Sequence, residues 1–305
     1  MPTDIRARRR ILASFIGSFS LLLAGPGVAI ADSREDKGAI VISGASGQLG
    51  SLVVRDLLER GVPASKLILV SRTPDKLAEF KSLGAATRFG DFTRPESLKD
   101  AFAGGHTLLL ISIGFDAGPR PKMHKNAIDA AVAAGIKRIV YTSYVAISQG
   151  DHTGLAGDHY QTEELIKGSG LAWTMLRNSI YSNGLVQQAA RMLKDGKVDV
   201  SDADPRIGYV TREDCAAAAA AVLAGAGHEN KAYDITGPEL VGAREIASAA
   251  SAVSGKPIQL VKRDKPGRGF GGPSIAVVSE DFEKVTGRRA TSLRALLEAN
   301  RDVLK

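Results

Sequence analysis

The chain has a single cysteine among its 305 residues, Cys215. One cysteine excludes an intrachain disulfide and a cysteine-based metal cluster. Its position in an alanine-rich helical stretch indicates a small core residue rather than a nucleophile. The five histidines show no spacing typical of metal ligands, so we predict no metal site. Ser143, at a predicted strand end, is not part of a G-x-S-x-G sequence, which disfavours a hydrolase triad.

Charge of one sign is concentrated only in the first 31 residues, which contribute four arginines and one aspartate. Without them the net charge falls from +7 to +4, and no block of like charge is left. Nucleic-acid binding is therefore not implied. The apolar run of this leader, residues 11–23, is too short and too interrupted by glycine for a good transmembrane span.

These first 31 residues predict an export signal. Basic residues precede the apolar run, and Ala29-Ile30-Ala31 forms an A-x-A cleavage site that would leave Asp32 at the mature N-terminus. Arg8-Arg9, followed by one residue and two apolar residues, resembles a twin-arginine signal, which exports folded proteins; a general secretory signal is the alternative. We expect a periplasmic protein without stable membrane insertion after cleavage, or an uncleaved membrane-anchored form.

A glycine-rich turn is the most informative motif of the chain. The β-type run 39–43 leads into GASGQLG, residues 44–50, and a helix-forming stretch follows. Gly44 permits a tight turn, Gly47 lets the backbone approach a pyrophosphate, and Gly50 lets the helix pack close to the strand. The helix N-terminus offers free N–H groups to phosphates. This strand–turn–helix context predicts a dinucleotide-binding site.

The ends of the next two β-type runs indicate which dinucleotide binds. The second run ends in Ser71-Arg72, where NAD-preferring folds place an acid, so we predict that Arg72 binds a 2′-phosphate and that the cofactor is NADP(H). A solvated surface arginine is the alternative. The third run leads to Asp91 and Phe92, predicted to lie at the adenine, with Asp91 accepting a hydrogen bond from its amino group. Asp91 could instead cap the helix at 94–102.

β-type runs alternate with helical stretches through most of the chain, which predicts an α/β fold, a Rossmann-type doubly wound parallel sheet. We assign residues 32–178 to this NAD(P)-binding domain and 179–305 to a small C-terminal substrate lobe that packs partly on it. The expected strands are 39–43, 66–71, 85–90, 107–113, 136–142, 171–177, 207–210 and 232–236. The expected helices are 47–60, 75–82, 95–102, 120–134, 156–168, 184–195, 211–224, 243–254 and 292–303.

Several stretches together resemble the NmrA-like atypical short-chain dehydrogenases, and within them the type 2 quinone oxidoreductases and triphenylmethane dye reductases. The resemblance covers about 39–262 and the last helix, and its most specific part is 159–183. The stretches are GASGQLG, GDFTRPESL, LLLISIG, the YTSY strand end, HYQTEELIKGSGLAWTMLRNSIYSN, IGYVTREDCAAAAAAVL and YDITGPELV.

The resemblance assigns roles to individual residues. It places Ser112, Ile113 and Gly114 under the ribose and Ser143 and Tyr144 beside the nicotinamide. Asn178 and Tyr181 would border the substrate pocket. For His124 the resemblance allows two interpretations. The residue would lie over the cofactor, or it would be an exposed histidine on a helix. The residues that would line the pyrophosphate are Gly44, Ser46, Gly47, Gln48, Leu49 and Gly50.

Two departures from the wider family bear on chemistry. Ketone-reducing short-chain dehydrogenases use Tyr-x-x-x-Lys, but those positions here hold Leu155 and His159. This fits quinone reduction, because hydride addition yields a stabilised hydroquinone anion that needs no strong acid. We predict that His159 faces the cofactor with Glu163 orienting its ring; a surface histidine is the alternative. The segment 262–278 is shorter, more basic and richer in glycine than the family's cap, so substrate specificity is the least transferable property.

The resemblance implies an enzyme that transfers hydride from NADPH to a quinone or similar planar acceptor. The predicted catalytic residues are His159, Tyr144 and Tyr181. A non-catalytic NADP(H)-binding sensor is the main alternative, favoured by the missing Tyr-Lys pair. A sugar-nucleotide or isoflavone-type reductase is disfavoured by the missing lysine. The sequence does not determine the oligomeric state, and a homodimer is one alternative.

Overall fold

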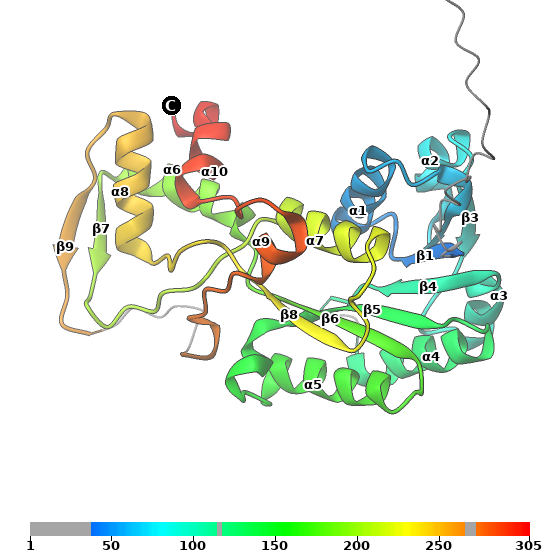
Figure 1. The fold of residues 1–305 in the computed structure, drawn as a ribbon. Coiled ribbons are helices and arrows are strands. Elements are labelled where there is room, and N and C mark those ends of the chain that lie inside the picture. Colours follow the sequence, from blue (N-terminus) through cyan, green and yellow to red (C-terminus); the bar gives the residue numbers. More distant parts are fainter. Residues whose placement is uncertain (1–37, 115–117, 266–272) are drawn as a thin grey trace, which may run out of the picture. The chain divides into compact units, whose positions relative to one another are not determined.

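In the described part of the chain, seven parallel strands form the central sheet, in the order β3-β2-β1-β4-β5-β6-β8 (Figure 1). The structure, a computed structural model, describes residues 38–114, 118–265 and 273–305, so the expected export signal lies outside the described residues. The strand order reverses between β1 and β4, and ligands of such sheets bind beyond the carboxyl ends at this point. The strands are β1 (Ala39–Ser43), β2 (Leu67–Ser71), β3 (Ala86–Phe89), β4 (Gly105–Leu110), β5 (Arg138–Tyr144), β6 (Ala172–Asn178) and β8 (Lys231–Ile235).

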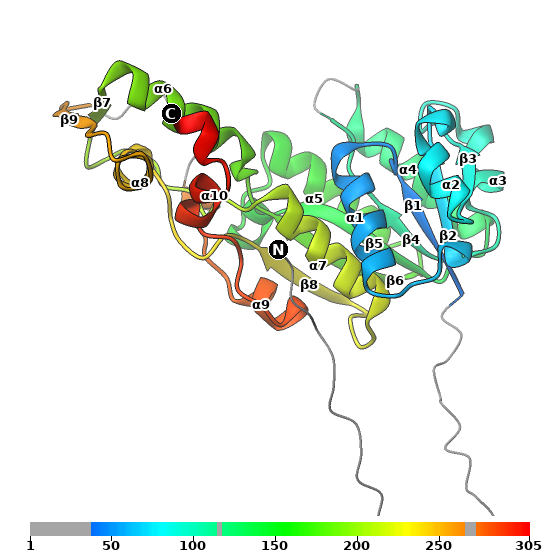
Figure 2. The ribbon, with the colours of Figure 1, turned by 90° about the horizontal axis from the view of Figure 1, so that it is seen from above.

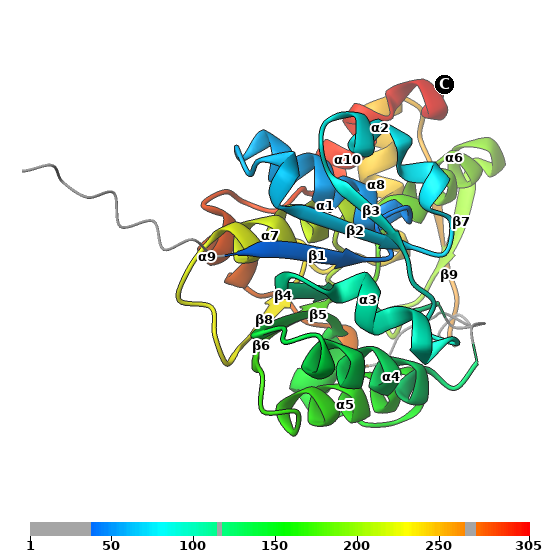
Figure 3. The same ribbon diagram turned by 90° about the vertical axis from the view of Figure 1, so that its right-hand side faces the viewer.

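The middle residues of the inner strands are mainly apolar and buried because helices cover both faces of the sheet. Ile40 and Ile42 of β1 pack toward α1 and α7, whereas Val41 between them packs toward α3 and α4. Figure 3 shows α1 and α7 on one side of the sheet and α3, α4 and α5 on the other. The predicted Rossmann-type fold is confirmed. The helices are α1 (Gln48–Glu59), α2 (Ala78–Ser82), α3 (Leu98–Phe102), α4 (Arg120–Ala133), α5 (Gly154–Lys167) and α7 (Arg212–Ala224).

The alanine-rich helix α7 is buried along residues 214–223, where small side chains permit close packing against α1 and the sheet. Cys215 lies in this buried stretch as a small core residue. None of the helices in the described ranges combines the length and the apolar character that crossing a membrane requires.

In the C-terminal part, the helices α6, α8 and α10 pack together beside a small parallel sheet of β7 and β9 (Figure 2). Its core joins Leu185 and Met192 of α6 to Ile246 of α8 and Leu297 of α10. The expected division at residue 178 stays a prediction; of the elements after it, β8 joins the central sheet and α7 packs against the core of that sheet. The elements are α6 (Leu185–Asp195), β7 (Lys197–Val200), α8 (Ala243–Ser254), β9 (Gln259–Lys262), α9 (Asp281–Thr286) and α10 (Leu293–Ala299).

Some C-terminal elements differ from the expected ones. The expected strand at 207–210 makes only isolated bridges, Ile207 to Val241 and Tyr181 to Val210. A Cβ on Gly208 would lie 1.8 Å from the Val277 carbonyl oxygen, so another segment crosses here at close range. The sequence analysis does not predict the strands β7 and β9 or the helix α9, because these elements are short and carry few apolar residues; β7 and β9 are strands only through their pairing with one another.

Candidate active site

The glycine-rich turn has the geometry that a pyrophosphate site requires. Gly44 has a φ of +72°, a left-handed conformation that L side chains rarely adopt. A Cβ on Gly50 would lie 2.3 Å from the Gly44 carbonyl oxygen and 2.8 Å from Ala45 Cα, so only glycine lets α1 approach the strand this closely. The N-cap, Gly47, provides no side-chain hydrogen bond, and the first turn holds no acid. The first turn of α1 is therefore open to an anion.

Serines join this turn to the end of β2. The hydroxyls of Ser46 and Ser71 are 2.6 Å apart, and Ser71 also accepts a hydrogen bond from the Thr73 amide at 2.9 Å. Arg72 follows at the strand end with an exposed side chain, beside the predicted phosphate site. An exposed side chain at the end of β2 is compatible with a contact to a 2′-phosphate, and this role of Arg72 stays a prediction.

Asp91 and Phe92 lie half-buried at the end of β3. Asp91 Oδ1 accepts hydrogen bonds from the amide and the hydroxyl of Thr93, both at 2.9 Å, so Asp91 closes a turn of its own. The alternative in which Asp91 caps the following helix is wrong, because the 3₁₀ turn there has Arg94 as its N-cap and α3 has Ser97. The Phe92 carbonyl accepts from Asn126 of α4 at 2.9 Å, which ties this strand end to the helix.

A buried histidine holds the segment after β4. His124 Nε2 accepts a hydrogen bond from the Ile113 amide at 3.2 Å, so the proton sits on Nδ1, which donates to Thr162 Oγ1 at 2.9 Å. The amide of the neighbouring Ser112 donates to Thr142 Oγ1 at 2.8 Å. His124 is 0% exposed, and burial together with the charge of Arg120 lowers its pKa to about 3.

The alternative of an exposed histidine at position 124 is therefore wrong, and the ring holds the predicted ribose segment through its bond to the Ile113 amide. Gly114, the last residue of that segment, is exposed.

His159 lies beneath Tyr144 rather than at the surface. It is 5% exposed, and its ring centroid is 5.8 Å from that of Tyr144. Its Nε2 accepts a hydrogen bond from Arg120 Nη2 at 3.0 Å, and its Nδ1 bonds the Tyr141 hydroxyl at 2.8 Å. Burial lowers the pKa of His159 well below its usual value, with Arg120 adding to the effect. The alternative of a surface histidine is wrong, because the ring is buried and bonded at both nitrogens.

Glu163 does not orient His159. Its carboxylate accepts from Ser143 Oγ at 2.6 Å and from Arg177 Nε and Nη2 at 2.9 and 2.8 Å. These partners lie on β5 and β6, so the side chain turns toward the sheet instead of along the helix. The predicted pairing of Glu163 with His159 is wrong, and Ser143 is held by a buried ion pair.

Asn178 and Tyr144 are paired residues at the carboxyl ends of β6 and β5. Asn178 Oδ1 and Ser179 Oγ are buried and find no hydrogen-bond partner among the described residues. Such atoms provide polar contacts for a bound group at this edge. Tyr181 packs against the core beside α7, and the Arg212 guanidinium lies 4.7 Å from its ring centroid, covering one face. The predicted role of Tyr181 at the acceptor stays a prediction.

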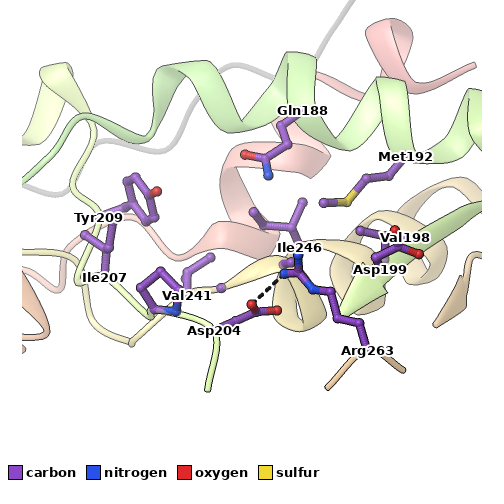
Figure 4. A pocket seen from close by; sticks show the side chains of 13 residues that line it. Gln188, Met192, Val198, Asp199, Asp204, Ile207, Tyr209, Val241, Ile246 and Arg263 are labelled. Carbon is purple, nitrogen blue, oxygen red and sulfur yellow. Dashed lines mark hydrogen bonds and ion pairs between the residues drawn. The ribbon is translucent and has the colours of Figure 1, made fainter. Parts of the chain in front are cut away.

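Taken together, these residues fit a dinucleotide: an uncapped first turn, glycines that a Cβ would block and unpartnered polar atoms at the sheet edge. Sequence reasoning missed a cavity of about 440 Å³ between α6, β7 and α8 (Figure 4). No single motif could have revealed it, because its walls come from separate segments between 188 and 263.

The sequence pattern of the family described as NAD(P)H-binding matches residues 44–226. The chain belongs to this NAD(P)H-binding family. Quinone oxidoreductase 2 of Escherichia coli (strain K12) is 37% identical over 219 residues, which cover 72% of this chain and 76% of that protein. The NAD(P)H azoreductase of Xenophilus azovorans is 28% identical over 222 residues, which cover 73% and 76%.

Among solved structures, the triphenylmethane reductase of Citrobacter sp. complexed with NADP(H) superposes with a TM-score of 0.76 at 31% identity, covering 86% of this chain and 99% of that chain. The predicted NmrA-like resemblance and the NADP(H) cofactor are confirmed, and the chain is an NAD(P)H-dependent oxidoreductase.

Proposed function

We propose that the chain transfers hydride from NADPH to a quinone or a similar planar acceptor. The supporting observation concerns His159, which occupies the position where ketone reductases have a lysine. His159 there is buried and neutral, and both of its nitrogens are engaged. Burial also raises the pKa of Tyr144, which weakens its phenol as an acid. An acceptor whose reduced form is a stabilised anion suits a site of this kind.

Each part of the site has a distinct task in this proposal. When bound, NADPH supplies the hydride. The first turn of α1 holds the pyrophosphate, and Arg72 pairs with the 2′-phosphate. His124 fixes the backbone at Ile113. Tyr144, supported from below by His159, presents its ring to a planar acceptor. The protein thus acts mainly by holding donor and acceptor in register.

Turnover by the purified protein tests this proposal. NADPH oxidation should be fast with menadione, a naphthoquinone, and slow with cyclohexanone or benzaldehyde. Tyr144→Phe should keep most of the menadione activity, because the ring remains, whereas Tyr144→Leu should lower it. A loss of about a hundredfold or more in Tyr144→Phe would identify the phenol as a general acid and contradict the proposal. Rapid ketone reduction would also contradict it, and tight NADPH binding without any hydride transfer would favour a sensor.

We also propose that the protein is exported folded, with its cofactor already bound. The basis is the Arg8-Arg9 pair before the apolar run and the A-x-A sequence at 29–31. Replacing both arginines with lysine should retain the uncleaved protein in the cytoplasm. Continued appearance of a periplasmic form beginning at Asp32 would instead show the general secretory route.

A further inference from the structure

The cavity in the C-terminal part has the size and the walls of a small-molecule site. Its volume of about 440 Å³ lies within the range of ligand pockets, about 300–1,000 Å³. Figure 4 shows side chains from α6 on one side and the turn after β7 on the other. The apolar part of the lining includes Met192, Ile207, Tyr209, Val241 and Ile246.

Four polar side chains also line this space: Gln188, Asp199, Asp204 and Arg263. The Arg263 guanidinium is held by Asp204, with 2.5 Å between Nη2 and Oδ1, and Asp204 accepts from the Ser201 amide at 2.7 Å. The Arg263 backbone is fixed as well, since its amide donates to the Val200 carbonyl at 2.9 Å. Arg263 Nε is buried and has no hydrogen-bond partner among the described residues. From α6, the Gln188 amide points toward the same space (Figure 4).

Charge limits which ligand can use these donors. Asp204 already balances Arg263, and the exposed Asp199 carboxylate also lines the cavity. Among the described residues that line the cavity, a negatively charged ligand would therefore meet more acidic than basic charge. A neutral carbonyl oxygen can still accept hydrogen bonds from the Arg263 guanidinium and the Gln188 amide, while an apolar ring fills the rest.

We propose that this cavity binds a neutral, ring-shaped carbonyl compound, with Arg263 and Gln188 as its hydrogen-bond donors. The proposal rests on the proposed function for its choice of a quinone-like occupant. It also places that occupant near the candidate active site. Ile207 lines the cavity and belongs to the apolar cluster against which Tyr144 and Tyr209 pack. One apolar cluster thus connects the wall of the cavity with Tyr144.

Binding without turnover tests the site directly. Equilibrium dialysis would compare 9-fluorenone, a neutral tricyclic ketone, with the anionic 9-fluorenone-4-carboxylate. We expect fluorenone to bind with a stoichiometry of one and the carboxylate to bind more weakly. Arg263→Met and Gln188→Leu should each weaken fluorenone binding, the first by about ten- to a hundredfold because it removes a charge-assisted donor. The double variant Asp204→Asn with Arg263→Met should show the same loss without leaving a lone carboxylate.

Arg244→Met provides the matched control, since Arg244 forms an exposed ion pair with Asp202 in the same part of the chain. It should leave fluorenone binding unchanged. Unaltered binding in both Arg263 variants, or preference for the carboxylate, would overturn the proposed site. Menadione reduction without fluorenone binding would overturn the site and leave the proposed function standing. Fluorenone binding that depends on Arg263, without reduction of any quinone, would support the site and remove the proposed function.

Discussion

Acidification should destabilise the protein through His124, whose buried ring can be protonated only by losing the hydrogen bond from Ile113. The ring is 0% exposed, and its Nε2 accepts the Ile113 amide at 3.2 Å. The pKa of His124 is lowered to about 3 in the folded chain, whereas the pKa of a histidine in the unfolded chain is about 6.5. The unfolded state therefore takes up the proton first as the pH falls.

The size of the effect follows from these two pKa values. The stability that His124 provides is complete above about pH 7 and is lost as the pH falls from about 6.5 toward 3. At pH 5 the loss relative to pH 7.5 should be about 2 kcal/mol from this residue alone. His159 adds a loss in the same direction, because its pKa is also lowered by burial.

Urea unfolding followed by circular dichroism at pH 7.5, 6.0 and 5.0 and constant ionic strength measures this loss. His124→Gln removes the titrating group but keeps an acceptor near Nε2, so it should lose about 2 kcal/mol less than wild type between pH 7.5 and 5.0. His106→Gln, at an exposed position, should follow wild type. Equal pH dependence in His124→Gln and wild type would refute the reasoning, whatever the stability of the variant at neutral pH.

Three further substitutions test other parts of the site. Arg72→Ala should weaken NADPH binding by about ten- to a hundredfold in a fluorescence titration and spare NADH; equal losses for both cofactors would remove the 2′-phosphate contact. Gly50→Ala should abolish binding in the same titration, because its Cβ would lie 2.3 Å from the Gly44 oxygen, whereas Gly184→Ala, with no atom within 4 Å, should bind normally. Glu163→Gln should cost about 2–4 kcal/mol of unfolding free energy by breaking the buried pair with Arg177. The exposed neighbour Glu164→Gln should cost under about 1 kcal/mol, and similar urea midpoints for the two would contradict the assigned burial.

The sequence by itself determined the elements whose causes are local. The strand at 39–43 was predicted with the bounds that the structure has, and the helix expected at 47–60 is Gln48–Glu59. An apolar β-type run, a glycine that accepts a positive φ and a helix-forming stretch act within twenty residues of one another. The family likewise follows from the glycine-rich turn and from stretches of contiguous sequence.

Only the tertiary structure decided the chemistry beneath the site. Position along α5 suggested that Glu163 would orient His159, but strands β5 and β6 offer Glu163 a serine and an arginine instead. The states of His124 and His159 depend on burial between packed elements, and spacing along one helix does not report that burial. The cavity beside Arg263 also depends on the packing of elements that are distant in the sequence. Its walls meet only when β7 and β9, about sixty residues apart, pair with one another.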